Sequence, residues 1–362
     1  MKKIIWSAVV VIIIVIGWLF TNNKQSKLVT SHSIKIGVIA PLSGPLAEYG
    51  EAFQNGIILA QEKLKNNKLQ FVFEDSAYDS GKAIAAFNKL KDFDKVNVII
   101  NWGDPTSQAI APLVKTNSIP FIAVTTIPSV AEQSPYIIRT LNRSEDAAGA
   151  TWEYLRSKNF KNVGIVKLET PYFNSLVDSL IKTKQTDEKV TIIDTYLSFG
   201  DKDFRTSISK IKNTSKYDVI GVFLAGGQIS QFYKQASTLE MKTPTFGTDF
   251  FESQSDIDAA GTTMNGVVYV NYDVSDDFRT EYQNRFKNIS QIAYAGNGYD
   301  TVMMLNSIPD ADKDSVINTL KAVKDYSGVV GKWNLLETTT DRYLSSPFHI
   351  KIIQDGIIKT LN

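Results

Sequence analysis

The chain has 362 residues, of which 43% are hydrophobic and 21% are charged, so it is long enough to bury the cores of two domains. Its 39 Lys and Arg residues nearly balance its 38 Asp and Glu residues, and no basic stripe indicates a nucleic-acid-binding surface. The sequence contains no cysteine, which excludes disulfides, thiolate metal sites, a cysteine nucleophile and a lipid-bearing cysteine.

The N-terminal segment predicts export of the chain. Lys2 and Lys3 precede an uninterrupted apolar run at residues 4–20, which as a helix would cover most of a hydrocarbon core. No small-x-small cleavage site follows this run, so we predict a retained membrane anchor, with a cleaved signal segment as the alternative. Residues 21–33 are polar and are expected to form a tether. Either alternative places the rest of the chain outside the cytoplasm.

The first periodic elements predict a β-turn-α-β unit. An alternating run at residues 34–40 indicates a buried strand, and the turn that follows it contains Pro41 and Pro45. A helix with helical apolar spacing and a second alternating strand at residues 69–73 come next. Ligands of open α/β sheets bind beyond the carboxyl ends of the strands, so we expect a small molecule to contact the segment from Ser43 to Tyr49.

The sequence PLSGPLAEYG at residues 41–50 resembles the opening of type I periplasmic binding proteins of the leucine/isoleucine/valine-binding group. The resemblance extends from about residue 34 to nearly the end of the chain. It implies an α/β fold of two Rossmann-like lobes with parallel sheets, joined by a three-segment hinge, that close on a ligand. Lobe 1 would take residues 34–142 plus 271–336, and lobe 2 would take residues 143–270 plus 337–362.

The rest of the chain repeats the alternation of strands and helices, which is typical of parallel sheets covered on both faces. Strands are predicted at residues 96–101, 119–124, 135–140, 162–167, 191–196, 218–224, 245–247 and 266–270. Helices are predicted at residues 108–115, 173–184, 204–212, 228–239, 276–286, 293–307 and 314–325. The pattern at residues 348–361 predicts a hairpin that finishes the edge of one sheet.

No motif for catalysis, metal binding or a phosphate-binding loop is found. The only histidines, His32 and His349, do not lie at the ends of predicted central strands. We therefore expect no catalytic residue, no metal and no cofactor, and an enzyme is the least supported class.

Two loops supply candidate groups for binding a ligand carboxylate. The resemblance implies that hydroxyls and backbone N–H groups after the third and fourth strands hold this group, and Thr106, Thr125 and Thr126 supply such hydroxyls. Asp104 stands where the family usually has a small hydroxyl residue, and its charge would repel a carboxylate. Alternatively, Asp104 caps a helix that continues with Pro105. Under both interpretations an anionic ligand group is less favourable.

One acidic residue matches the family's contact with a ligand ammonium group. The resemblance implies this role for Asp249, and the alternative is a helix cap or a solvated loop carboxylate. The family's second carboxylate aligns with Ser144, which is also a plausible N-cap of the next helix, so half of the amino-acid clamp is missing.

Aromatic residues are expected to complete the cleft. Tyr49, Tyr172 and Tyr294 align with ring positions of the family, and Trp102 directly precedes the loop at Gly103. At a further position where the family often has an aromatic residue, residues 225–227 read Ala-Gly-Gly. This sequence predicts a roomier wall in lobe 2.

Together these features predict the solute-binding component of an ABC importer, on the periplasmic or extracellular face of a bacterial membrane. It would capture a small polar ligand of the amino-acid or amide class, deliver it to a membrane permease and have a monomeric soluble portion. A ligand-sensing receptor subunit of the same fold is the alternative. Asp104, Ser144 and Ala225 favour a neutral amide, a polyol or a cationic amine over a branched-chain amino acid.

Overall fold

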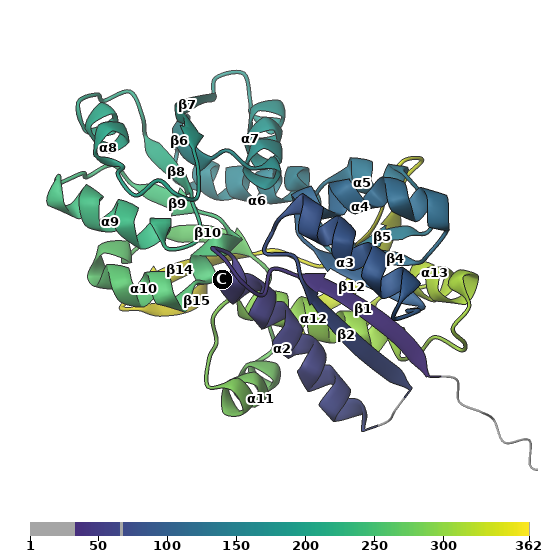
Figure 1. The fold of residues 1–362 in the computed structure, drawn as a ribbon. Coiled ribbons are helices and arrows are strands. Elements are labelled where there is room, and N and C mark those ends of the chain that lie inside the picture. Colours follow the sequence, from purple (N-terminus) through teal and green to yellow (C-terminus); the bar gives the residue numbers. More distant parts are fainter. Residues whose placement is uncertain (1–32, 66–67, 362) are drawn as a thin grey trace, which may run out of the picture. The chain divides into compact units, whose positions relative to one another are not determined.

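The computed structural model describes residues 33–65 and 68–361. No helix in these two ranges is long and apolar enough to cross a membrane. The predicted anchor at residues 4–20 and nearly all of the predicted tether lie outside the described residues. The residues from Ser33 onward form one compact unit that contains two sheets (Figure 1).

The first sheet has eight strands in the order β11-β12-β13-β5-β4-β3-β1-β2. Its central strands pair in parallel, and β12 pairs in antiparallel fashion with β11 and β13 at one edge. We call this sheet and the helices packed on it lobe 1. Its strands are β1 (Ile34–Ala40), β2 (Leu69–Asp75), β3 (Val98–Trp102), β4 (Phe121–Val124), β5 (Ile137–Arg139), β11 (Tyr326–Gly328), β12 (Gly331–Glu337) and β13 (Arg342–Ser345).

The second sheet has seven strands in the order β15-β14-β10-β9-β8-β6-β7. The predicted C-terminal hairpin is confirmed, because β14 and β15 pair in antiparallel fashion and β15 is an edge strand. This sheet and its helices form lobe 2. Its strands are β6 (Asn162–Leu168), β7 (Lys189–Leu197), β8 (Val219–Phe223), β9 (Thr245–Gly247), β10 (Val268–Asn271), β14 (His349–Gln354) and β15 (Ile357–Leu361).

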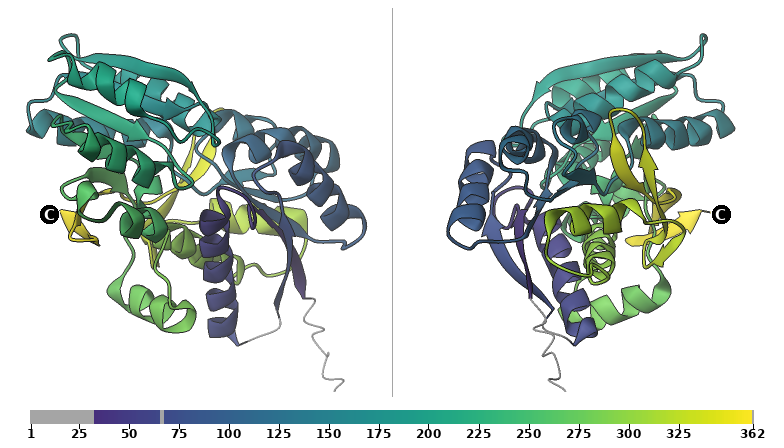
Figure 2. Two further views of the ribbon diagram at one scale, coloured as in Figure 1. Left: turned by 60° about the vertical axis from the view of Figure 1, so that its left-hand side comes forward. Right: turned by 90° about the vertical axis from the view of Figure 1, so that its right-hand side faces the viewer.

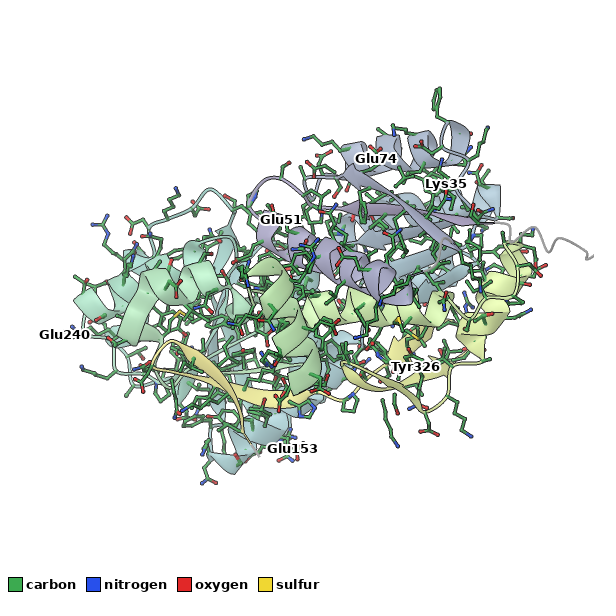
Figure 3. All side chains as sticks on the ribbon, turned by 90° about the horizontal axis from the view of Figure 1, so that it is seen from below. Lys35, Glu51, Glu74, Glu153, Glu240 and Tyr326 are labelled. Atoms are coloured by element: carbon green, nitrogen blue, oxygen red, sulfur yellow. The ribbon has the colours of Figure 1, made fainter. Side chains whose placement is uncertain are left out.

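Helices cover both faces of each sheet, as the continuous apolar runs of the central strands predict (Figures 1 and 2). In β1, Ile36 and Val38 pack in one core cluster, whereas Ile39 packs in a second cluster on the other face. Exposed charged residues such as Glu153 and Glu240 lie at the periphery (Figure 3). The helices are α2 (Ala47–Leu64), α3 (Ser80–Asp92), α4 (Asp104–Asn117), α5 (Pro128–Glu132), α6 (Ser144–Ser157), α7 (Pro171–Thr183), α8 (Arg205–Lys212), α9 (Gln228–Thr238), α10 (Gln254–Ala260), α11 (Asp276–Phe286), α12 (Ile292–Leu305) and α13 (Lys313–Lys321).

The chain passes between the two sheets three times, after β5, after β10 and after β13. The sequence prediction ended lobe 1 at residue 336, but β13 pairs with β12 and β5 in the first sheet. The reason is a tight turn in which the Thr338 N–H donates to the Asp341 carbonyl at 2.8 Å, so that β12 and β13 form a hairpin. The last passage between the sheets therefore falls between Ser345 and His349.

Helices α2 and α12 approach so closely that glycine is required at their contact. A Cβ atom on Gly56 would overlap the backbone of Ala295, and one on Gly298 would lie 2.6 Å from the Phe53 carbonyl oxygen. We expect Gly56→Ala to lower the free energy of unfolding by about 2–3 kcal/mol, because the helices must separate.

Denaturation of this variant by urea tests the expectation, with Gly149→Ala as the control. Gly149 is an exposed residue inside α6, and an added Cβ there meets no atom within 4 Å. The control should gain about 0.5–1 kcal/mol, since alanine favours a helix over glycine. Equal stability of the two variants would contradict the close packing of α2 on α12.

Candidate ligand-binding cavity

A cavity lies between the lobes, at the carboxyl ends of parallel strands from both sheets. Trp102 and Thr126, which end or follow β3 and β4, line it from lobe 1. Asp249 and Asn271, which follow β9 and end β10, line it from lobe 2 and from the second passage between the lobes. The cavity encloses about 600 Å³ of space between atoms, which includes its opening to solvent.

Most of the predicted site residues reach this cavity. Those that line it are Trp102, Asp104, Thr126, Tyr172, Asp249 and Tyr294. Ser43, Tyr49, Thr106 and Thr125 do not line it. The Ser43 hydroxyl donates instead to Asp75 Oδ2 at 2.5 Å, and the Thr106 hydroxyl donates to the Gly103 carbonyl at 3.1 Å. These side chains stabilise the loops behind the cavity wall.

Asp104 is the first residue of α4, and its buried carboxylate binds the loop that follows β4. Oδ1 accepts hydrogen bonds from the Thr125 hydroxyl at 2.6 Å and from the Thr126 N–H at 3.0 Å. Oδ2 accepts from the Thr126 hydroxyl at 3.0 Å, and burial raises the pKa of Asp104. No side chain caps α4, so the helix-cap interpretation of Asp104 is wrong. The Thr125 and Thr126 donors expected to hold a ligand carboxylate are thus bound to a carboxylate of the protein.

Asp249 begins the short 3₁₀ helix η1 (Asp249–Glu252), and its carboxylate binds two tyrosines. The Tyr172 hydroxyl donates to Oδ1, and the Tyr294 hydroxyl donates to Oδ2. Tyr172 belongs to α7 in lobe 2, whereas Tyr294 belongs to α12 in lobe 1, so the second bond joins the lobes. Burial raises the pKa of Asp249 to about 6. The N-cap of η1 is Thr248, which excludes the helix-cap alternative for Asp249.

Two buried donors that belong to cavity-lining residues have no partner among the described residues. They are the indole N–H of Trp102 and the amide NH₂ of Asn271. Trp102 is 4% exposed and Asn271 is 2% exposed. The Asn271 side-chain oxygen accepts from the Tyr272 N–H at 2.8 Å, which leaves the amide nitrogen free. A buried donor without a partner is costly, so these groups favour a ligand that supplies an acceptor.

Aromatic rings from both lobes form much of the cavity wall. The rings of Trp102 and Tyr294 meet edge to face, with their centroids 5.2 Å apart. The ring centroids of Tyr172 and Phe250 are 5.4 Å apart. Sequence reasoning missed several further members of the wall, namely Tyr78, Phe250, Tyr272 and Phe348. Phe250 directly follows Asp249, so its position next to a strand end was a usable signal.

Comparison with known proteins decides the family. The family described as periplasmic binding protein matches residues 33–350. The chain belongs to this family. The match and the two-lobed structure confirm the predicted type I periplasmic binding protein of the leucine/isoleucine/valine-binding group.

This periplasmic binding protein is similar to proteins of known name and structure. It is 27% identical to a Leu/Ile/Val-binding protein of Rhizobium johnstonii, over 84% of this chain and 88% of the relative. It is 26% identical to the Leu/Ile/Val-binding protein of Escherichia coli, over 68% of this chain and 71% of the relative.

Solved structures share the fold. A leucine-binding protein of Thermotoga maritima superposes with a TM-score of 0.80 at 21% identity, over 91% of this chain and 98% of that chain. An R. palustris solute-binding protein in complex with benzoate has the same TM-score at 21% identity, over 91% of this chain and 95% of that chain.

Side chains tie together the three segments that join the lobes of this periplasmic binding protein. The Asn142 amide donates to the Ser346 carbonyl at 2.9 Å, and the Ser346 N–H donates to the Asn142 side-chain oxygen at 3.1 Å. The Tyr272 hydroxyl accepts from the Asn142 N–H at 2.8 Å. Asn142 and Tyr272 also line the cavity, so the hinge forms part of its wall.

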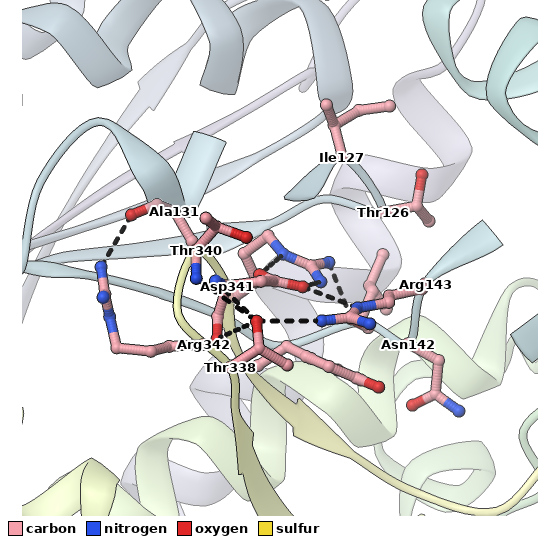
Figure 4. Close-up of polar contacts among 12 residues, drawn as sticks. Thr126, Ile127, Ala131, Asn142, Arg143, Thr338, Thr340, Asp341 and Arg342 are labelled. Carbon is pink, nitrogen blue, oxygen red and sulfur yellow. Dashed lines mark hydrogen bonds and ion pairs between the residues drawn. The ribbon is translucent and has the colours of Figure 1, made fainter. Parts of the chain in front are cut away.

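The first of these segments is anchored by a buried carboxylate (Figure 4). Asp341 pairs with Arg139 at 2.6 Å and with Arg143 at 2.8 Å. Helix α6 begins directly afterwards at Ser144, and the residue in the N-cap position is Arg143 rather than the predicted Ser144. The Ser144 hydroxyl accepts a hydrogen bond from the Ser175 hydroxyl at 2.8 Å and therefore joins α6 to α7.

The segment at residues 225–227 does not enlarge the cavity, contrary to the sequence prediction. Ala225 and Gly226 do not line it, and a Cβ atom on Gly226 would lie 3.0 Å from the Pro45 carbonyl oxygen. Pro45 belongs to the turn after β1 in lobe 1, whereas Gly226 follows β8 in lobe 2. The missing side chain therefore lets the two lobes approach each other.

Proposed function

We propose that this chain is the extracytoplasmic solute-binding component of an ABC importer. It captures a small polar solute, in the size range of amino acids and amides, when its two lobes close, and it delivers the solute to a membrane permease. The observation that carries this proposal is the cavity at the lobe boundary, to which both lobes contribute a carboxylate and aromatic rings. The carboxylate of lobe 1, Asp104, is buried, and that of lobe 2, Asp249, is partly buried. The family assignment supports the same function.

Contacts between the lobes support capture by closure. The Tyr49 hydroxyl of α2 donates to the Phe250 carbonyl at 3.3 Å, and the Ser253 hydroxyl donates to Glu48 at 2.6 Å. A solute in the cavity adds contacts to both lobes only when they are closed, so it shifts the population toward the closed state. The named ligands of similar proteins, isoleucine and benzoate, are small molecules of the expected size.

A thermal-shift screen of the chain against amino acids, amides, amines, polyols and carboxylates tests this function. A ligand at 100 times its dissociation constant should add about 2.7 kcal/mol to the free energy of unfolding. No shift with any of these classes would contradict the proposed function.

Asp249→Asn is expected to abolish most of the ligand-induced shift without lowering the stability of the unliganded protein. The partly buried carboxylate accepts hydrogen bonds from Tyr172 of α7 and Tyr294 of α12, with Glu252 of η1 nearby, and an amide still offers both hydroxyls a partner. The pKa of Asp249 is higher in the folded state than its ordinary value of 3.8, so the folded state binds more protons between about pH 4 and 6.

The pH dependence checks this assignment. The contribution of Asp249 to stability is present below about pH 4 and is lost as the pH rises through about 6. The stability of Asp249→Asn relative to the wild type should therefore increase over this range, as urea titrations at several pH values would show. A variant that is destabilised equally at every pH would indicate a purely structural Asp249.

A further inference from the structure

We propose that the captured solute is a small organic cation, with its amine or ammonium group between Asp104 and Asp249 and a hydrogen-bond acceptor elsewhere on the molecule. This inference rests on the proposed function, because it assigns the chemistry of the solute that the lobes enclose. It names Asp104 as a direct contact of the cation.

The first argument concerns the groups that an anionic solute would need. A carboxylate on the solute would seek the N–H and hydroxyl of Thr126 at the end of β4, but both already donate to Asp104 at 3.0 Å. An incoming carboxylate would have to displace Asp104 or lie beside it in a desolvated cavity. Both alternatives are unfavourable, because like charges repel more strongly where water is excluded.

The second argument concerns two carboxylates that have no cation in direct contact. Burial raises the pKa of Asp104, and the charge of the Arg139 guanidinium acts to lower it with a smaller effect. Asp104 is 5% exposed, and neither it nor Asp249 forms an ion pair with any described residue. Among other buried carboxylates, Asp341 has a cationic partner in Arg139, and Glu252 has one in Lys351. Asp256 and Asp300 are also buried without an ion pair among the described residues, but they do not line this cavity, and N–H groups hold both of their oxygens. The cavity thus contains two carboxylates whose charges no adjoining protein cation offsets by direct contact.

The two carboxylates come from opposite lobes, and their fields overlap in the cavity. Both raise the pKa of the same three tyrosines, Tyr78, Tyr172 and Tyr294, after the larger effect of burial. Closure of the empty protein brings these like charges together, which costs free energy. A cation between them replaces the repulsion with attraction to both lobes, so it stabilises the closed state specifically.

The third argument concerns the cationic side chain at the cavity wall. Arg143 is turned toward the hinge, where its Nε donates to Asp341 at 2.8 Å (Figure 4). Its guanidinium lies over the Tyr343 ring, 4.9 Å from the ring centroid. Arg139 is fully buried and also binds Asp341. Both guanidinium groups are therefore committed to a protein carboxylate rather than presented to an anionic solute.

The aromatic wall and the unpartnered donors complete the description of the solute. Trp102, Tyr172 and Tyr294 surround the region of Asp249, and the faces of such rings attract cations by up to about 2 kcal/mol each when water is excluded. The free N–H groups of Trp102 and Asn271 require an acceptor. An amino alcohol or a quaternary ammonium compound with an oxygen atom satisfies both requirements.

Choline and its uncharged isostere 3,3-dimethylbutan-1-ol provide a direct test, because they share shape and hydroxyl group and differ in charge. We expect choline to bind the chain at least about tenfold more tightly than the isostere in calorimetric titrations at pH 7.5, and more tightly than leucine or benzoate. Equal affinity of choline and the isostere, or tightest binding of leucine or benzoate, would overturn the cation assignment and leave solute capture intact. No binding of any of the four probes would overturn the cation assignment, whereas the proposed function fails only if the broader thermal-shift screen also gives no shift.

Asp104→Asn should weaken choline binding at least about tenfold, with Asp75→Asn as the matched control. Asp75 ends β2 of lobe 1 and, like Asp104, accepts hydrogen bonds from loop N–H groups and a hydroxyl, but it is exposed and does not line the cavity. Its replacement should leave the affinity for choline unchanged. Because Asp104 is buried, thermal melting without ligand checks that the variant folds. The comparison of choline with its isostere uses the wild-type protein, so it tests the cation assignment even if the variant does not fold. Unchanged choline affinity in a folded Asp104→Asn would overturn the role of Asp104.

Discussion

Asp341→Asn is expected to lower the free energy of unfolding by about 3–5 kcal/mol, because it leaves a buried guanidinium without its counter-charge. Arg139 is 0% exposed and donates to both oxygens of Asp341, at 2.8 and 2.6 Å. The remaining partners of Arg139 are the carbonyl oxygens of Thr125 and Leu141, which cannot neutralise it. The same substitution loosens Arg143 and thereby the first segment of the hinge.

Asp187→Asn provides the control for this prediction. Asp187 pairs with Lys161 at 2.6 Å, the distance found between Asp341 and Arg139, but its side chain is 59% exposed. Exposed pairs contribute about 0–1 kcal/mol, so guanidinium chloride denaturation should show little change for this variant. If Asp341→Asn and Asp187→Asn lower the free energy of unfolding equally, burial is not what makes the Arg139–Asp341 pair important for stability.

Gly226→Val is expected to weaken binding of the tightest solute at least about tenfold, by opposing closure of the lobes. The added Cβ would lie 3.0 Å from the Pro45 carbonyl oxygen of the opposite lobe, and the further methyl groups of valine enlarge the overlap. Gly226 does not line the cavity. A loss of affinity in this variant would therefore not come from a direct contact with the solute. Calorimetric titration measures the loss.

The neighbouring glycine separates closure from backbone strain. Gly227 also has a positive φ, +88° against +63° for Gly226, but an added Cβ there meets no atom within 4 Å. Gly227→Val should therefore destabilise lobe 2 by a similar amount while preserving affinity. If both variants keep wild-type affinity, the contact between Gly226 and Pro45 does not form in the liganded protein.

Much of the fold follows from local patterns because the central strands are buried on both faces. The runs around Ile36 and Ile165 are apolar and β-branched, and these strands were predicted within a few residues. The edge strands β11, β12 and β13 were missed, since their alternation is irregular and their pairing depends on a tight turn. The ion pair that places β13 joins residues 202 positions apart, which no local pattern shows.

The cavity was predicted less completely, for a physical reason. Asp249 was inferred from the family resemblance, and Trp102 from its position directly before the loop at Gly103, where a strand ends. The roles of Tyr78 and Phe348 depend on how closely the lobes approach and on where the hinge segments pass. The proposed ligand chemistry depends on the hydrogen bond from the Thr126 N–H to the Asp104 carboxylate. This contact joins two segments that are far apart in the sequence, so no local pattern shows it.

Double electron–electron resonance between spin labels on the two lobes tests the central claim, closure on a cation, most directly. The chain has no cysteine, so Lys82→Cys in α3 and Lys202→Cys, both at exposed positions, can be labelled specifically. Tyr78 of lobe 1 and Phe199 of lobe 2 have ring centroids 6.3 Å apart, so these labels flank a point where the lobes meet. We predict that saturating choline shifts the distance distribution to a single shorter population, whereas 3,3-dimethylbutan-1-ol at the same concentration does not. An identical distribution with and without bound choline would contradict capture by lobe closure.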